Sequence, residues 1–138
     1  MKLTNQEALN ARQGFALLAI APENKGRAHF DIEVAYPMLI AKRKLETIGA
    51  DITAAQKDLT EQHGKRDEAG RLVQRQTAQG QETEFLPEAL LAFQAAWAAL
   101  LAQTQDYDGP TFTKAQFAGR TVDPDALFLL GPLFTVDP

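Results

Sequence analysis

The chain has 138 residues, of which 45% are hydrophobic and 23% are charged, and its formal net charge is −4. These values are ordinary for a globular protein, so we expect a single domain that spans residues 1–138. The acidic balance argues against a general nucleic-acid binder, whose surface would be basic, although a local group of arginines is still able to hold a small anion.

The first expected element is a helix that begins at a capping box. In Thr4-Asn5-Gln6-Glu7 the threonine precedes the glutamate by three positions, and the helix should run to about Ile20. Apolar and polar residues then alternate from Phe30 to Tyr36. This period of two predicts a half-buried strand, with a helical turn as the alternative because the stretch is short.

The most regular pattern predicts a long helix over residues 38–62, with Pro37 at its start. Its apolar residues recur in steps of three and four positions and form one stripe: Leu45, Ile48, Ile52, Ala55 and Leu59. Such a helix extends about 37 Å, which is long for so small a domain. We therefore expect a second copy of the chain to cover part of the stripe, giving a homodimer or a higher homo-oligomer.

A hairpin and a second long helix are predicted next. Asp67-Glu68-Ala69-Gly70 is typical of a turn, and Leu72-Val73 with Glu84-Phe85-Leu86 indicate the arms of a hairpin around Gln79-Gly80. Pro87 then opens a helix that should reach about Gln105. The apolar face of that helix consists of Leu90, Phe93, Trp97, Leu100 and Leu101.

The last elements are short. Thr111 to Phe117 predicts a strand, and Asp123 is suited to cap a short helix with Pro124 at its first position, before Gly131-Pro132 ends it. Together the elements predict an α+β fold, dominated by helix, with a small antiparallel sheet. We expect the two long helices to pack against each other through the Leu45–Leu59 and Leu90–Leu101 stripes.

The residue types needed for catalysis are missing or scattered. The chain has no serine and no cysteine, and its two histidines lie 34 positions apart. Asp106-Tyr107-Asp108-Gly109 begins like a calcium loop but lacks the later ligands. We therefore expect no metal, no cofactor and no enzymatic activity. The start of the chain is not a secretory signal, and no apolar stretch is long enough to span a membrane.

Ligand binding is the remaining class of function, and the loop arginines are the best candidate residues for it. Arg66, Arg71 and Arg120 fall in loop regions, and a guanidinium matches a phosphate through two parallel hydrogen bonds. Phe93 is one of several aromatic residues able to stack on a base. A simpler interpretation stays open for each: the arginines of a mixed-charge turn are usually solvated, and an aromatic at helical spacing usually belongs to the core.

The order of motifs resembles a group of small phage and prophage proteins. The residues that carry the resemblance are Lys2-Leu3-Thr4-Asn5, Ala41-Lys42-Arg43-Lys44-Leu45, the turn from Gly64 to Gly70, and the Asp-x-Leu-x-x-Leu pattern from Asp125 to Leu130. The group is similar to the phage anti-Thoeris sponge proteins, which bind and sequester cyclic ADP-ribose signals of a bacterial defence system. Asp31-Ile32-Glu33-Val34 departs from the Pro-x-Lys-x-x-Phe pattern of the group, so nothing is carried over there.

The resemblance implies an anti-defence protein that sequesters a cyclic nucleotide signal, without cleaving it, in the cytoplasm of an infected bacterium. It also implies a homodimer with ligand pockets where subunits meet. Phe93 would stack on a base, and Arg66 or Arg71, together with Arg120, would hold phosphates. Two alternatives remain open: a structural or assembly accessory protein of a phage particle, and an inhibitor that binds a host enzyme.

Overall fold

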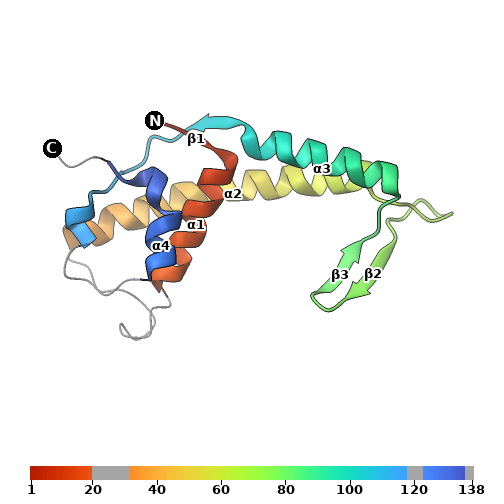
Figure 1. Ribbon diagram of the computed structural model, residues 1–138, viewed down its shortest axis with the longest axis horizontal. Helices are drawn as coiled ribbons and strands as arrows, with labels where there is room; N and C mark the ends of the chain where they lie inside the picture. Colours follow the sequence, from red (N-terminus) through yellow and green to blue (C-terminus); the bar gives the residue numbers. More distant parts are fainter. Residues whose placement is uncertain (20–31, 118–122, 136–138) are drawn as a thin grey trace. The chain divides into compact units, whose positions relative to one another are not determined.

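The fold is α+β and dominated by helix (Figure 1). The computed structural model describes residues 1–19, 32–117 and 123–135. The chain divides into a first unit, Met1–Ala50 with Thr104–Pro138, and a second unit, Asp51–Gln103. Helix α2, Ile32–His63, contributes residues to both units. The expectation of a single domain stays a prediction.

In its described residues the first unit contains helices α1 and α4, the N-terminal part of α2, a two-stranded antiparallel sheet of β1 and β4, and two 3-10 turns. Their bounds are β1 Lys2–Thr4, α1 Asn5–Ala19, β4 Thr104–Asp106, η2 Lys114–Phe117, α4 Pro124–Leu129 and η3 Gly131–Leu133. The predicted capping box is confirmed, because the Thr4 N–H donates to Glu7 Oε1 at 2.9 Å and the Glu7 N–H donates to Thr4 Oγ1 at 3.0 Å. Asp123 caps α4 as predicted, accepting from the Asp125 N–H at 2.8 Å.

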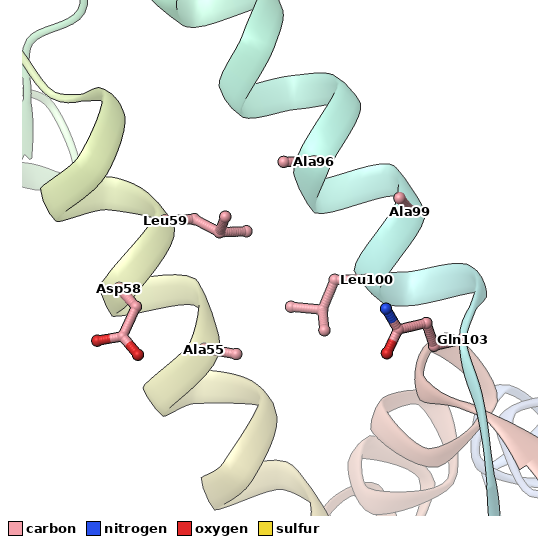
Figure 2. Close-up of a pocket in the computed structure, with 7 residues that line it drawn as sticks. All are labelled: Ala55, Asp58, Leu59, Ala96, Ala99, Leu100 and Gln103. Atoms are coloured by element: carbon pink, nitrogen blue, oxygen red, sulfur yellow. The ribbon is translucent and has the colours of Figure 1, made fainter.

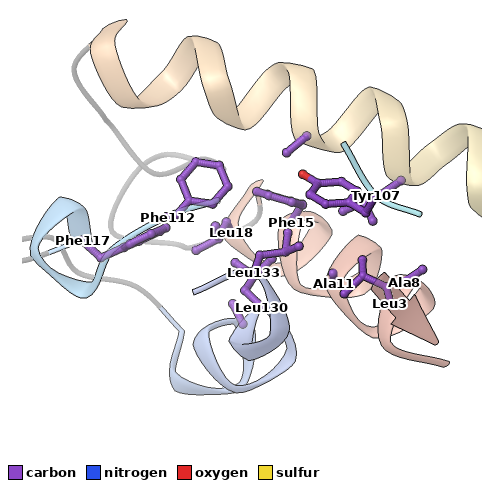
Figure 3. Packing of buried hydrophobic residues seen from close by; sticks show 13 residues of the cluster. Leu3, Ala8, Ala11, Phe15, Leu18, Tyr107, Phe112, Phe117, Leu130 and Leu133 are labelled. Carbon is purple, nitrogen blue, oxygen red and sulfur yellow. The ribbon is translucent and has the colours of Figure 1, made fainter. Parts of the chain in front are cut away.

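A continuous hydrophobic core holds the first unit together (Figure 3). Phe112 lies between Phe15 and Phe117, with ring centroids 6.2 Å from each in edge-to-face geometry. Gly14 allows α1 and α4 to approach closely, since a Cβ there would lie 2.8 Å from Leu130 Cγ and 3.0 Å from the Ala126 carbonyl oxygen. The fully or nearly fully buried members are Leu3, Ala8, Ala11, Leu18, Ala41, Leu45, Tyr107, Ala126, Leu130 and Leu133.

The second unit contains the remainder of α2, a β-hairpin and helix α3. The hairpin pairs β2, Gln74–Thr77, with β3, Gly80–Thr83, and α3 is Pro87–Ala102. Gly80 has a φ of 116°, which favours glycine at the turn. The hairpin prediction is thus confirmed, with its strands nearer the turn than expected. Gly64 ends α2, and a Cβ there would lie 2.7 Å from Leu72 Cδ2.

Two predicted strands are wrong. Residues Ile32–Tyr36 belong to α2, so Pro37 lies inside the helix; Ile32 and Tyr36 are 70% and 59% exposed, and no described strand pairs with them. Residues Phe30 and Asp31 lie outside the described residues. In Thr111–Phe117, only Phe112 forms a bridge, to Phe134, and the residues from Lys114 onward form a 3-10 turn.

The stripe on the long helix is divided between the two units. Leu45 is fully buried in the core of the first unit, and Ile48 packs against that core. Ala55 and Leu59 instead line a pocket in the second unit. The expectation that the whole stripe would pack against α3 is therefore wrong, because its N-terminal part has other partners.

Candidate functional site

The charged turn after α2 is built around the carboxylate of Asp67. Its Oδ1 accepts from the N–H groups of Ala69 and Arg71 at 2.9 and 3.0 Å, and the Asp67 carbonyl accepts from the Gly70 N–H at 3.0 Å. Gly70 has a φ of 81°, which a side chain would disfavour. The turn thus has a defined geometry of its own.

Arg66 is a structural part of this turn. Its Nη1 donates to the Gly70 carbonyl oxygen and its Nη2 donates to the Glu61 carbonyl oxygen, both at 2.8 Å. The guanidinium thereby joins the last turn of α2 to the loop that follows, and it satisfies the Glu61 carbonyl, which lies in the last turn of the helix where carbonyls lack intrahelical partners. A phosphate would have to compete with these two bonds, so Arg66 is a weaker phosphate ligand than the sequence suggested.

Arg71 is better placed to meet a ligand. Its backbone is held by Asp67, while its side chain is exposed and forms no hydrogen bond or ion pair with any described residue. Arg75, on β2, is also exposed and faces Glu82 across the hairpin in the strand register. Arg71 and Arg75 are therefore the arginines of this region whose guanidinium groups have no partner among the described residues, and Arg71 is the one that lies on the turn.

Phe93 already has an aromatic neighbour. Its ring lies 4.8 Å from that of Phe85 with an interplanar angle of 36°, and the side chain is half-buried. This contact fixes Phe93 beside the segment that leaves the hairpin. No hydrogen bond, ion pair or ring contact joins Phe93 with Arg66 or Arg71 in the described part of the chain. The fourth predicted residue, Arg120, lies outside the described residues.

A shallow pocket lies between the second-unit part of α2 and helix α3 (Figure 2). Its volume is about 340 Å³. Figure 2 shows Leu59 and Leu100 pointing toward the space between the two helices. The other lining residues are Ala55, Asp58, Ala96, Ala99 and Gln103. The lining is thus mainly aliphatic, with one carboxylate and one amide at its edges.

Helix α3 leaves most of its apolar surface uncovered. None of its residues is fully buried, and its charged residue is Glu88 in the first turn. Leu91 is 68% exposed, Leu90 is 38% exposed and Leu86, which caps the helix, is 55% exposed. Ile52 is the one fully buried side chain in Asp51–Gln103, a range that the structure describes completely. The second unit therefore presents an uncharged surface where a stable helix normally has its core partner.

The sequence pattern missed this surface because it placed the apolar face of α3 in a core. Periodicity identifies which residues share a face, but it does not say whether anything in the same chain covers that face. The sequence signal that could have indicated this surface is the lack of charge, because no residue from Ala89 to Ala102 is charged. A helix that is apolar on every side needs cover on every side.

The perturbed acid–base groups lie in the first unit and are explained by local contacts. Burial, with a smaller contribution from the Asp108 carboxylate, raises the pKa of Tyr107 to about 12. The Tyr107 hydroxyl donates to the Pro110 carbonyl oxygen at 2.7 Å. A hydrogen bond from Lys44 lowers the pKa of the Asp108 carboxyl. Each shift thus has a structural cause that requires no ligand.

Searches of the described ranges and comparisons with known proteins assign no chemistry to these features. No group of three or more potential metal-binding side chains occurs among the described residues. No helix in the described ranges is both long and apolar enough to cross a lipid bilayer. No protein-family model, curated protein or solved structure matches the chain.

Proposed function

We propose that this protein acts by association, as an accessory subunit that assembles with other copies, the structural or assembly role that the phage resemblance leaves open. The observation that carries the proposal is helix α3, which is 16 residues long with no buried residue and with its charge confined to Glu88. Exposed apolar patches that are this continuous are typical of surfaces that bind a partner.

Burial of apolar surface provides the driving force. Removing such surface from water contributes about 25 cal/mol per Å², and a free monomer forgoes that contribution along the exposed side of α3. The second unit has Ile52 as its one fully buried side chain, so its own core contributes little. Association would therefore stabilise the second unit as well as join subunits.

Light scattering and sedimentation test this function. At tens of micromolar we expect a mass of at least twice the chain mass of 15.1 kDa, with dissociation on dilution. The unfolding temperature should rise with protein concentration, because assembly stabilises the native state by mass action. A single species at the monomer mass across this range would contradict the proposal.

A second candidate function is the sequestration of a cyclic ADP-ribose type signal without cleavage. The observation that favours it is the exposed, unpaired guanidinium of Arg71 on a turn whose backbone is held by Asp67. A charge-assisted hydrogen bond contributes about 1.5–3 kcal/mol, and stacking on a base contributes about 1–3 kcal/mol. Two phosphate contacts with one stacked base would then contribute about 4–9 kcal/mol, and the upper end of that range corresponds to micromolar affinity.

Calorimetry with purified cyclic ADP-ribose isomers tests this second candidate. Arg71→Ala should abolish the heat of binding, whereas Arg75→Ala, an equal loss of charge that leaves the turn untouched, should change it little. Heating the complex and separating the released compounds by chromatography should return the ligand intact. The absence of a heat of binding for every cyclic nucleotide would exclude sequestration. Release of a cleaved ligand would show that the protein is an enzyme.

A further inference from the structure

The exposed side of α3 can be assigned from the burial of its residues. Phe93, Trp97 and Leu100 are half-buried, so they mark the side that faces the rest of the second unit. The residues on the opposite side are all exposed, and we call them the outer stripe: Leu91, Ala95, Ala98 and Ala102. They are spaced four, three and four positions apart, which is the spacing of a continuous stripe along a helix.

The chemistry of this side favours a second copy of α3 as its cover. The flanking exposed residues Leu90, Ala92 and Ala99 extend the uncharged surface on both sides of the outer stripe. On α2, the other long helix, the exposed positions of the second unit include Asp51, Lys57, Asp58 and Glu61. Burying those charges against α3 would cost desolvation without a pairing group, whereas the one charge of a second α3, Glu88, lies in its first turn, before the outer stripe begins.

The outer stripe is also complementary to itself when two copies run antiparallel about a two-fold axis. With the axis level with the middle of the stripe, Leu91 lies level with Ala102 of the partner subunit, and Ala95 lies level with Ala98 of the partner subunit. The largest side chain of the stripe thus meets one of the smallest. A two-fold interface requires such self-complementarity, because both subunits contribute the same patch.

Alanines at the centre allow a close approach of the two helices. Helix axes that pack through small side chains lie about 8 Å apart, the lower end of the usual range. A helix of 16 residues is about 24 Å long, so one face of it gives less contact than the roughly 800 Å² per subunit of a standard interface. Association through this face should therefore be reversible in the micromolar range.

We propose that α3 pairs antiparallel with α3 of a second copy through the outer stripe, with Leu91 of each subunit against Ala102 of the partner subunit. This inference rests on the proposed function and adds to it the surface, the partner and the relative direction of the two helices. The pocket lined by Leu59 and Leu100 is centred on the other side of α3, and Ala99 is the residue that borders both the pocket and the contact.

Disulfide trapping tests the direction, since the natural chain has no cysteine. We would make Leu91→Cys and Ala102→Cys as separate variants. In the antiparallel arrangement each introduced thiol is about 16 Å along the axis from its own copy in the partner, beyond the reach of a disulfide. The two variants mixed should therefore form a covalent dimer under mild oxidation, while either variant alone should not.

A matched pair on the other side of the helix is the control. Ala89→Cys and Leu100→Cys have the same spacing of eleven positions but occupy half-buried positions, and they should give no covalent dimer alone or mixed. Covalent dimers from Leu91→Cys alone or Ala102→Cys alone would indicate parallel helices and overturn the proposal. No cross-link in the outer-stripe mixture, from a protein that light scattering shows to be oligomeric, would also overturn it while leaving the proposed function standing.

A charge variant gives an independent measurement. Ala98→Glu places two carboxylates near the two-fold axis and should weaken dimerisation by about tenfold or more, with an unchanged helical circular dichroism spectrum. Ala54→Glu introduces the same change at an exposed position of α2 and should leave the dissociation constant unchanged. Equal effects of the two variants, or no effect of Ala98→Glu, would contradict pairing through the outer stripe.

Discussion

The two units use apolar residues in opposite ways. In the first unit, apolar side chains from α1, α2, α4 and the loops enclose one another, and Leu45 and Ala41 have no exposed surface. In the second unit, α3 is rich in leucine and alanine, yet none of its residues is fully buried. Apolar composition therefore predicts burial only where the same chain supplies a partner. The first unit is completed by its own chain, whereas the second has an uncovered surface.

Truncating one leucine in each unit should give the largest difference in stability between the two units. Leu45→Ala removes a side chain with 0% exposure and should lower the free energy of unfolding by about 2–5 kcal/mol. Leu91→Ala removes one that is 68% exposed and should change the stability of the monomer by less than about 0.5 kcal/mol. Urea denaturation at low micromolar concentration measures both. Similar losses of unfolding free energy in the two variants would show that the two units do not differ in how far they bury their leucines.

A second test concerns the one buried side chain of the second unit. Ile52 is 3% exposed, so Ile52→Ala should cost about 2–4 kcal/mol of unfolding free energy. Thr53→Ala, at the neighbouring exposed position, is the control and should have little effect. The measurement is again urea denaturation. A cost for Ile52→Ala below about 0.5 kcal/mol would mean that its burial contributes nothing to folding.

Two glycines test how tightly the first unit is packed. Gly14→Ala places a methyl group 2.8 Å from Leu130 Cγ and 3.0 Å from the Ala126 carbonyl oxygen, and the overpacking should cost about 1–3 kcal/mol. Gly131→Ala is the matched control, because a Cβ there has no neighbour within 4 Å. Thermal unfolding followed by circular dichroism measures the difference. An unchanged midpoint for Gly14→Ala would refute the close approach of α1 and α4.

The smallest expected effect is a dependence of stability on alkaline pH. The pKa of Tyr107 is raised from 10.0 to about 12, so the native state holds the phenolic proton more tightly than the unfolded chain does. The resulting stabilisation is complete below pH 10 and is lost as the pH rises toward 12, by about 1.4 kcal/mol per pH unit. Tyr107→Phe should flatten this part of the profile relative to the natural chain. An equal slope in both proteins would assign the effect to other groups.

Local chemistry made parts of the fold predictable. The capping box at Thr4 and Glu7, the Asp123 cap and the hairpin around Gly80 were predicted because each is decided by residues within a few positions of one another. The pairing of β1 with β4 was missed, since Leu3 meets Gln105 and nothing local in either segment indicates the other. The strand predicted at Ile32–Tyr36 was wrong because alternation over so few residues also fits a helical turn.

The candidate site was less predictable than the fold. Residue type drew attention to the arginines of the charged turn, but the contacts that Arg66 and Arg71 make depend on loop geometry. Two backbone carbonyls occupy the Arg66 guanidinium, while the neighbouring Arg71 side chain projects without a partner among the described residues. Spacing cannot distinguish these outcomes. The uncovered side of α3 was likewise hidden, because periodicity does not reveal what a helix packs against.

The pairing of β1 with β4 has a consequence for the order of events on the ribosome. Leu3 is synthesised before its partner Gln105, which follows about 100 residues later. At a rate of synthesis of about 5–20 residues per second, β4 follows β1 after roughly 5–20 s. Throughout that interval the apolar face of α1 lacks α4, which is synthesised later still. The whole of Asp51–Gln103 is thus synthesised between the two segments of the first unit, and until the second segment follows the nascent chain carries exposed apolar surface that a chaperone is able to bind.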